Sequence, residues 1–333
     1  MIYIVTNREI DTKNEPDLIF GASQNKKDID EIRLATAEKK GAKWKVSLLE
    51  EPKDLKDDSD LARYPSFTLF KDLQKRMKEN KRNCLFFIHG FNVNFIDALK
   101  AAEKLRKKYN VEIVLFTWPA KGAGEGKKMP GEGFLGLLNY RKDKRIASVS
   151  APHLAKSLKR LGQYFEWNRQ NGEDCGQSMN LLCHSMGAYV FKTIFKSSIY
   201  APTEPTFDNV VLAAADVNNE GHELFVDKIP HLRKVYIAIN EDDKALTASR
   251  MKIGEKQKAR LGQLTRNFAA ENAIYLDFTD APKLNDSHSY VMECSTGEKK
   301  NIAHKVFNEI LNGQRGERLL NHFYPGKKVC QVK

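Results

Sequence analysis

The sequence has no long apolar run, and this absence removes one class of protein at the outset. None of its 333 residues belongs to a stretch close to the roughly 18 consecutive apolar residues that a membrane-spanning helix needs. The first residues (MIYIVTNR) have the pattern of a strand and lack the basic and then apolar pattern of a signal peptide. We therefore expect a cytoplasmic protein.

Cysteine is scarce, with five residues and no C-x-x-C pair. Cys84, Cys183 and Cys294 lie in or beside apolar segments, which is typical of reduced thiols in a cytosolic protein and not of a disulfide framework. No cluster of potential ligands has the spacing of a metal site. We therefore expect a protein that needs no metal and no organic cofactor.

Acidic residues are too few to balance the basic ones, and the net charge is +12. Such an excess suggests nucleic acid or an anionic membrane as a partner. The lysines, however, occur in scattered pairs interleaved with acids, mostly on helices whose other face is apolar, as in residues 98–105 (ALKAAEKL). A solvated face explains this pattern better, so we do not expect a nucleic-acid partner. Peripheral contact with a lipid surface stays open, and the sequence does not determine the oligomeric state.

What the sequence does contain is an alternation of apolar strands and amphipathic helices, in a chain that is 41% hydrophobic and has no internal repeat. Residues 1–60 hold β-like runs at 2–6, 18–22 and 44–48, and a charged linker at 50–60. The expected strands that follow are 84–88, 111–117, 179–183, 209–215, 234–239 and 273–278, and the expected helices are 66–78, 95–108, 141–169, 188–195 and 300–311. This order predicts an α/β fold, with a mostly parallel central sheet and helices on both faces. We expect one domain over residues 1–311 and an irregular C-terminal tail over residues 312–333.

Residues 179–190 (MNLLCHSMGAYV) are the most informative stretch, because an apolar strand enters a sharp turn and a helix begins at once. Ser185 lies at the turn, with the small residues Cys183 and Gly187 two positions before and after it. This spacing is typical of a nucleophile elbow, in which the serine backbone is strained and larger flanking side chains would collide with neighbouring elements. The first small residue is usually glycine, and a thiol is small enough to replace it.

A second motif upstream points to the same chemistry. Residues 84–88 (CLFFI) form an apolar strand that ends in an H-G turn at residues 89–92 (HGFN). In serine hydrolases of this architecture, the residue after such a turn and the residue after the nucleophile donate their N–H groups to the oxyanion. These donors would be Phe91 and Met186. An ordinary strand-to-helix turn is the alternative, but the order and separation of the two motifs argue against coincidence.

A serine hydroxyl needs a base to take its proton, and this architecture has the chain order serine, acid, histidine. Five histidines follow Ser185, and His288 alone lies in a polar loop (residues 285–290) directly after the last apolar strand. We therefore expect His288 to be the base. His184, beside the nucleophile, should point away from it and serve as a packing residue.

The acid has two serious candidates, since Asp216 and Asp243 both follow strands and geometry alone does not separate them. The usual position, after the strand that precedes the final strand, favours Asp243. Its neighbour Asp242 is not fully excluded. Asp216 could instead cap a helix at residues 218–223.

Residues 121–138 carry six glycines, and residues 131–136 (GEGFLG) formally satisfy the dinucleotide-binding pattern G-x-G-x-x-G. We reject that interpretation because Pro130 precedes the pattern and the strand ends well upstream; no Walker motif fits either. We expect a lid-like loop over residues 119–139, with Phe134 and Leu135 among the apolar residues that bind substrate. A plain surface insertion is the alternative.

Together these motifs resemble an α/β-hydrolase family, similar to esterases and lipases, that has no assigned function. The matching segments are 6–8 (TNR), 87–92 (FIHGFN), 116–119 (FTWP), 184–187 (HSMG), 215–216 (AD), 243–246 (DKAL), 260–262 (RLG) and 288–290 (HSY), with the spaced residues Tyr140, Asp143, Ala147 and Ser150. The resemblance covers residues 1–311 and implies an α/β-hydrolase fold, with Ser185, Asp243 and His288 as nucleophile, acid and base. It implies no particular substrate.

The sequence therefore predicts a serine hydrolase that cleaves small-molecule or lipid carboxylic esters through an acyl-enzyme intermediate. The alternative is a catalytically idle member of the same fold that binds a protein or nucleic-acid partner, since fold alone does not determine function. The net charge of +12 favours this alternative, and the intact set of candidate catalytic groups argues against it.

Overall fold

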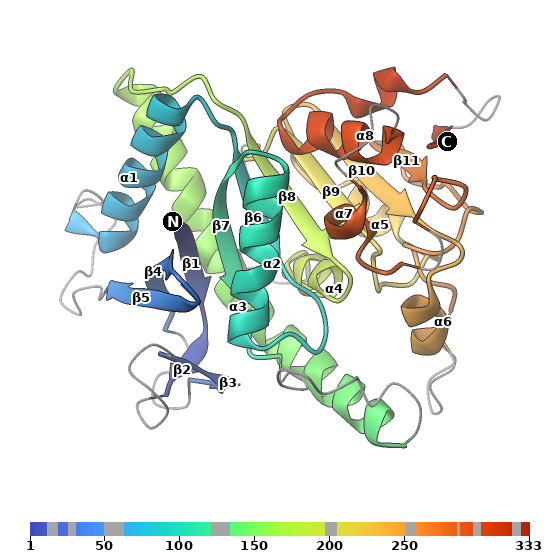
Figure 1. Ribbon diagram of the computed structural model, residues 1–333, viewed down its shortest axis with the longest axis horizontal. Helices are drawn as coiled ribbons and strands as arrows, with labels where there is room; N and C mark the ends of the chain where they lie inside the picture. The colour runs from blue at the N-terminus through green and yellow to red at the C-terminus, as the bar shows by residue number, and fades with distance from the viewer. Residues whose placement is uncertain are drawn as a thin grey trace.

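A ten-stranded sheet forms the centre of the protein, as a computed structural model shows (Figure 1). The structure describes residues 1–11, 19–25, 31–49, 63–120, 134–196, 205–250, 258–284, 287–295, 301–321 and 328–333. The strand order is β12-β11-β10-β9-β8-β6-β7-β1-β4-β5. A separate antiparallel pair, β2 (Arg8–Ile10) and β3 (Phe20–Gln24), lies outside this sheet.

Eight neighbouring strands, from β12 to β1, pair in parallel, so their carboxyl ends lie at one edge of the sheet. The hairpin β4–β5 continues the sheet in antiparallel fashion at the other side of β1. The strands are β1 (Ile2–Thr6), β4 (Arg33–Lys40), β5 (Lys43–Leu49), β6 (Cys84–Ile88), β7 (Glu112–Thr117), β8 (Met179–His184), β9 (Asn209–Ala213), β10 (Lys234–Ile239), β11 (Ala273–Asp277) and β12 (Val329–Gln331). The mostly parallel sheet expected from the sequence is confirmed.

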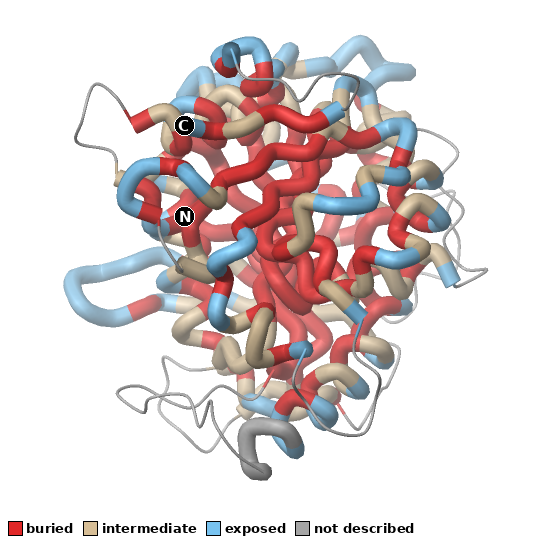
Figure 2. Tube along the Cα trace, turned by 90° about the vertical axis from the view of Figure 1, so that its right-hand side faces the viewer, coloured by how far each residue is buried: buried red, intermediate tan, exposed pale blue. Residues whose placement is uncertain are grey.

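Helices cover both faces of the sheet, and each face has its own apolar core. Along β6, Phe86 belongs to the core under α1 (Pro65–Asn80), α3 (Phe134–Gln170), α4 (Gly187–Ile194) and α5 (Glu223–Val226). Leu85 and Phe87 belong to the core under α2 (Phe95–Lys108), α6 (Lys244–Arg250), α7 (Tyr290–Glu293) and α8 (Ile302–Leu311). Because the central strands β1 and β6–β10 are buried on both sides, their sequences are nearly continuous apolar runs, and in Figure 2 the buried residues fill the middle of the molecule.

The longest helix, α3, begins at Phe134, seven residues before the expected start. The expectation of a loop is therefore wrong for residues 134–139, which are helical although they include Gly136, because the three leucines among these six residues favour a helix. The preceding residues, 121–133, lie outside the described part of the chain. Across the described residues, no helix has both the length and the apolar character to cross a membrane.

The C-terminal residues also differ from the expectation of an irregular tail over residues 312–333. They include a 3-10 helix at Gly316–Leu319 and the short strand β12, which pairs in parallel with β11. Val329 and Val332 are fully buried, so this segment completes the edge of the sheet. Three residues of strand are too few to give a recognisable period in the sequence.

Ending the chain at Leu320 should therefore destabilise the fold. Loss of the buried Val329, Cys330 and Val332 side chains should lower the free energy of unfolding by about 3 kcal/mol or more. Urea unfolding of the truncated and full-length proteins measures the difference. Equal stability would show that β12 contributes no packing.

Candidate active site

Ser185 occupies a strained turn between β8 and α4. Its φ is +54°, in the left-handed region that few residues other than glycine adopt. Neighbouring backbone groups hold the turn: the Ser185 N–H donates to the Ala213 carbonyl (3.0 Å), and the Ser185 carbonyl accepts from the Asp216 N–H (3.1 Å). The turn predicted from the spacing of small residues is present in this form.

The small residues around Ser185 are required by close contacts. A Cβ at Gly187 would lie 2.5 Å from the carbonyl oxygen of Ile88, and a Cβ at Gly90 would lie 2.8 Å from the Ser185 Cβ. Cys183 fits in the place usually taken by glycine, and its side chain is fully buried. Burial raises the pKa of this thiol well above its ordinary value, so Cys183 is an inert packing residue and not a competing nucleophile.

His288 and Asp243 are in direct contact. Asp243 follows β10 and is fully buried, and its Oδ2 lies 2.7 Å from Nδ1 of His288. Its Oδ1 accepts from the Leu246 N–H (3.0 Å), so the same carboxylate is fixed by the first turn of α6. The His288 side chain is 26% exposed, so its imidazole is accessible to a molecule that enters the site.

Asp216, the other candidate acid, has different partners. It forms an ion pair with the Nε of Arg260 (3.0 Å) and accepts hydrogen bonds from Ser249 Oγ (2.7 Å) and the Tyr140 hydroxyl (2.9 Å). Asp216 and Arg260 are both almost completely buried. Asp216 therefore belongs to a closed polar cluster, while Asp242 is exposed. Of the three carboxylates considered from the sequence, the structure brings Asp243 to His288.

His184 is buried, as expected for a packing residue, but it also contacts the loop of His288. Its Nε2 lies 3.0 Å from the His288 carbonyl oxygen, and the two ring centroids are 4.9 Å apart. Burial lowers the pKa of His184 to about 3, so the ring is neutral and its Nε2–H donates to that carbonyl. This contact holds the backbone of His288 beside the elbow.

The H-G turn after β6 is fixed by a second neutral histidine. His89 Nδ1 lies 3.0 Å from the Gly90 carbonyl oxygen, its Nε2 accepts from the Trp118 N–H (3.2 Å), and its ring stacks on Trp118. Burial lowers its pKa to about 3. The Thr117 hydroxyl also reaches His89 Nε2 (3.0 Å) and so donates to it. The turn that carries Phe91 is therefore attached to the end of β7.

Arg8 also belongs to this region, although no role for it was expected from the sequence. The buried guanidinium donates from Nε to Thr117 Oγ1 (2.9 Å) and from Nη2 to the Val93 carbonyl (3.0 Å). It thus joins the first strand segment to the loop after β6. The only signal for it was its place in the segments that resemble the hydrolase family.

Tyr290 is a second such residue, and it braces the backbone beneath the site. Its hydroxyl accepts from the Ala214 N–H (3.0 Å) and donates to the Ala238 carbonyl (2.8 Å). Ala214 has a φ of +48°, and a Cβ at Gly262 would lie 2.1 Å from the neighbouring Ala215 nitrogen. The matching AD, RLG and HSY segments therefore meet at one point.

The structure describes the remaining expected site residues to different extents. Met186 precedes α4 directly and is buried, and the Phe91 ring lies 5.6 Å from that of Tyr140 in α3. Phe134 and Leu135 form the first turn of α3, but their side chains lie outside the described residues. Within the described ranges, no group of three or more His, Cys, Asp or Glu side chains could hold a metal ion.

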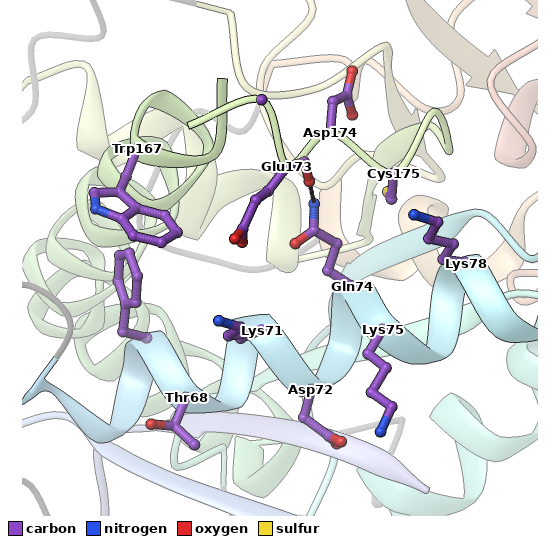
Figure 3. A pocket seen from close by; sticks show the side chains of 12 residues that line it. Thr68, Lys71, Asp72, Gln74, Lys75, Lys78, Trp167, Glu173, Asp174 and Cys175 are labelled. Atoms are coloured by element: carbon purple, nitrogen blue, oxygen red, sulfur yellow. Dashed lines mark hydrogen bonds between the residues drawn. The ribbon is translucent and has the colours of Figure 1, made fainter. Parts of the chain in front are cut away.

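A cavity of about 650 Å³ lies elsewhere, between α1 and the segment that leads from α3 to β8 (Figure 3). Its lining includes Phe67, Trp167 and the exposed amines of Lys71 and Lys75, and a hydrogen bond from Gln74 to the Glu173 carbonyl crosses it. It lies before the amino end of β8, whereas Ser185 follows its carboxyl end about 20 Å away. The cavity is not part of the candidate active site.

One family model matches the chain over residues 66–303, and its description is an alpha/beta hydrolase of unknown function (DUF900). The match covers more than half of the chain and includes Ser185, Asp243 and His288. No curated protein matches the chain.

The two buried neutral histidines predict that stability falls in mild acid. In the unfolded chain they bind protons below about pH 6.5, whereas His89 and His184 bind them in the native state only near pH 3. Their contribution is therefore complete above pH 6.5 and falls as the pH decreases toward 3. Between pH 7 and pH 5 we expect each to lower the free energy of unfolding by about 2 kcal/mol.

Urea unfolding of the wild type and of His184→Gln at both pH values tests this. The variant has no titrating group at this position, so its stability should fall by about 2 kcal/mol less than that of the wild type. An equal decrease in both proteins would contradict the assignment of His184 as neutral.

Proposed function

Since the chain belongs to this family of alpha/beta hydrolases of unknown function, we propose that it is a serine hydrolase that cleaves carboxylic esters. Ser185 is the nucleophile, His288 the general base and Asp243 the acid that orients the base. The observation that carries the proposal is the 2.7 Å contact between Asp243 and His288, in a loop attached to the strained turn of Ser185. The natural substrate is a small-molecule or lipid ester.

The contact with Asp243 sets the direction of proton transfer. With Nδ1–H donated to the carboxylate, the His288 Nε2 lone pair is available to accept the proton of Ser185. The serine oxygen then attacks the ester carbonyl, and the alcohol leaves with that proton. Water, deprotonated by the same Nε2, releases the acid and restores Ser185.

The oxyanion of each tetrahedral intermediate accepts hydrogen bonds from the N–H groups of Phe91 and Met186. Two observations support this. The Met186 N–H has no backbone acceptor in the part of the chain that the structure describes. The Phe91 turn lies against the elbow, since Gly90 approaches Ser185 within the distance that only a glycine permits.

Phe134 and Leu135 remain our proposed contacts for the acyl part of the substrate. The support comes from Tyr140, less than two turns further along α3, whose ring contacts Phe91 at 5.6 Å between centroids. The start of α3 therefore belongs to the same edge of the sheet as the proposed oxyanion donors.

The second candidate function, an idle binding module, is favoured only by the net charge of +12. A fluorophosphonate probe separates the two, because it labels a serine only when the serine is activated. Labelling at neutral pH that disappears in Ser185→Ala supports the hydrolase. No labelling of the wild type would support the binding module.

Ser185→Ala should abolish ester hydrolysis with little change in stability. Only the oxyanion donors and substrate binding would remain, so we expect kcat to fall about 10³-fold or more. Nitrophenyl esters of increasing acyl length measure the loss and also define the preferred chain. Unchanged turnover would refute the assignment of the nucleophile.

Asp243→Asn should mainly lower turnover, whereas Asp216→Asn should mainly lower stability. Asp243→Asn disturbs the tautomer of His288, so we expect kcat to fall about 10⁴-fold. Asp216→Asn removes the carboxylate charge that pairs with the buried Arg260, so it should lower the free energy of unfolding by about 3 kcal/mol and change kcat of the folded protein little.

Turnover and urea unfolding of both variants provide the comparison. The assignment fails if Asp216→Asn is the variant that loses turnover while remaining stable. Asp242→Asn serves as the matched control, since that carboxylate is exposed, and it should be nearly silent in both measurements.

A further inference from the structure

The outward face of α3 is cationic over most of its length. Between residues 138 and 159 its exposed cations are Arg141, Lys142, Arg145, Lys156 and Lys159. The only acid between residues 134 and 165 is Asp143, which is buried and turned inward. From residue 138 to residue 159 the face extends about 30 Å along the helix.

The other surface helices do not share this character. On α1, Lys75 is 3.9 Å from Glu79, and on α2, Lys107 is 3.2 Å from Glu103. Exposed acids thus accompany the exposed lysines there, as on an ordinary solvated face. Within residues 134–165 of α3, by contrast, the helix itself carries no exposed acid that alternates with its cations.

Large apolar side chains interrupt the same face. Leu138 is 43% exposed and Val149 is 44% exposed, and both lie among the cations just named. Exposed Arg and Lys attract anionic headgroups, and apolar side chains at the same surface can be buried at the boundary between headgroups and acyl chains.

The inward face of the same turns contacts the candidate active site. Tyr140 contacts Phe91 and Asp216, and Asp143 Oδ2 accepts from the Asn92 N–H (3.3 Å). In Figure 1 the first turns of α3 extend past the carboxyl ends of β6 and β8. The cationic face therefore begins at the edge of the sheet that carries Ser185.

We propose that the outward face of α3 docks the protein on an anionic lipid surface. The cations bind the headgroup phosphates, and Leu138 and Val149 enter the boundary between headgroups and acyl chains. The two exposed apolar side chains favour a lipid surface over nucleic acid, since a phosphodiester backbone offers them no contact. Docking in this way brings the proposed ester site close to lipid substrates, but it does not depend on hydrolysis.

The experiment compares two variants of the full chain that remove the same charge. One carries Arg141→Gln, Lys142→Gln and Arg145→Gln on α3. The control carries Lys71→Gln, Lys75→Gln and Lys78→Gln, three exposed lysines of α1. Flotation measures binding to vesicles of phosphatidylcholine alone and of phosphatidylcholine mixed with phosphatidylglycerol, and thermal unfolding by circular dichroism confirms that each variant is folded.

We expect the wild type and the α1 control to bind the anionic vesicles and not the neutral ones. The α3 variant should bind about 100-fold more weakly, which corresponds to roughly 1 kcal/mol for each cation at the surface. Leu138→Ser should also weaken binding, although it changes no charge.

Three results would overturn the proposal. The first is no binding of the wild type to anionic vesicles at low salt, and the second is an equal loss in both charge variants. The third is binding of the wild type to polyuridylate that is tighter than its binding to anionic vesicles, that is lost in the α3 variant and that Leu138→Ser does not change. This result would assign the face to nucleic acid. The vesicle assay involves no ester turnover, so its results can be interpreted even if the hydrolase proposal fails. In the same way, the hydrolase proposal can be tested even if the protein does not bind vesicles.

Discussion

The left-handed backbone of Ser185 is the constraint on which the surrounding structure depends. Such a conformation costs on the order of 1–3 kcal/mol, so it persists only where neighbouring groups hold it. Hydrogen bonds with Ala213 and Asp216, at the end of β9, supply part of this support, and glycines at positions 90 and 187 allow the end of β6 to approach the elbow. The supports therefore come from the strands on either side of β8, and the parallel sheet brings their carboxyl ends together.

The same dependence extends to the proposed base. His184 precedes Ser185 in the elbow and donates to the backbone of His288, while Tyr290, two residues after His288, braces the strained Ala214. The histidine loop is therefore attached both to the elbow and to the end of β9 that supports the elbow. A change that relaxes one should displace the other, and this explains why residues without reactive groups surround the site so closely.

Much of this could be predicted from the sequence wherever the signal is local. The strand at residues 84–88 and the elbow were identified because every strand residue is apolar and the small residues have a fixed spacing around Ser185. The choice between Asp216 and Asp243 was left to the usual position in the architecture, because both follow strands and only three-dimensional contacts reveal Arg260 as the partner of Asp216. Strand β4 (RLATAEKK) was missed because half of its residues are charged or exposed near the sheet edge. Arg8 lies in a segment that resembles the hydrolase family, but nothing in that segment indicates its distant partners.

The long reach of the Arg8 contacts has a consequence for how the protein folds. Arg8 bonds with Thr117 across a sequence separation of 109 residues, and β1 pairs in parallel with β7. Parallel pairing over such a distance raises contact order, which slows folding. During synthesis β1 lacks its partner β7 on one side until residue 117 has left the ribosome. The turn that carries Phe91 therefore acquires its final support late, although its own strand is made early.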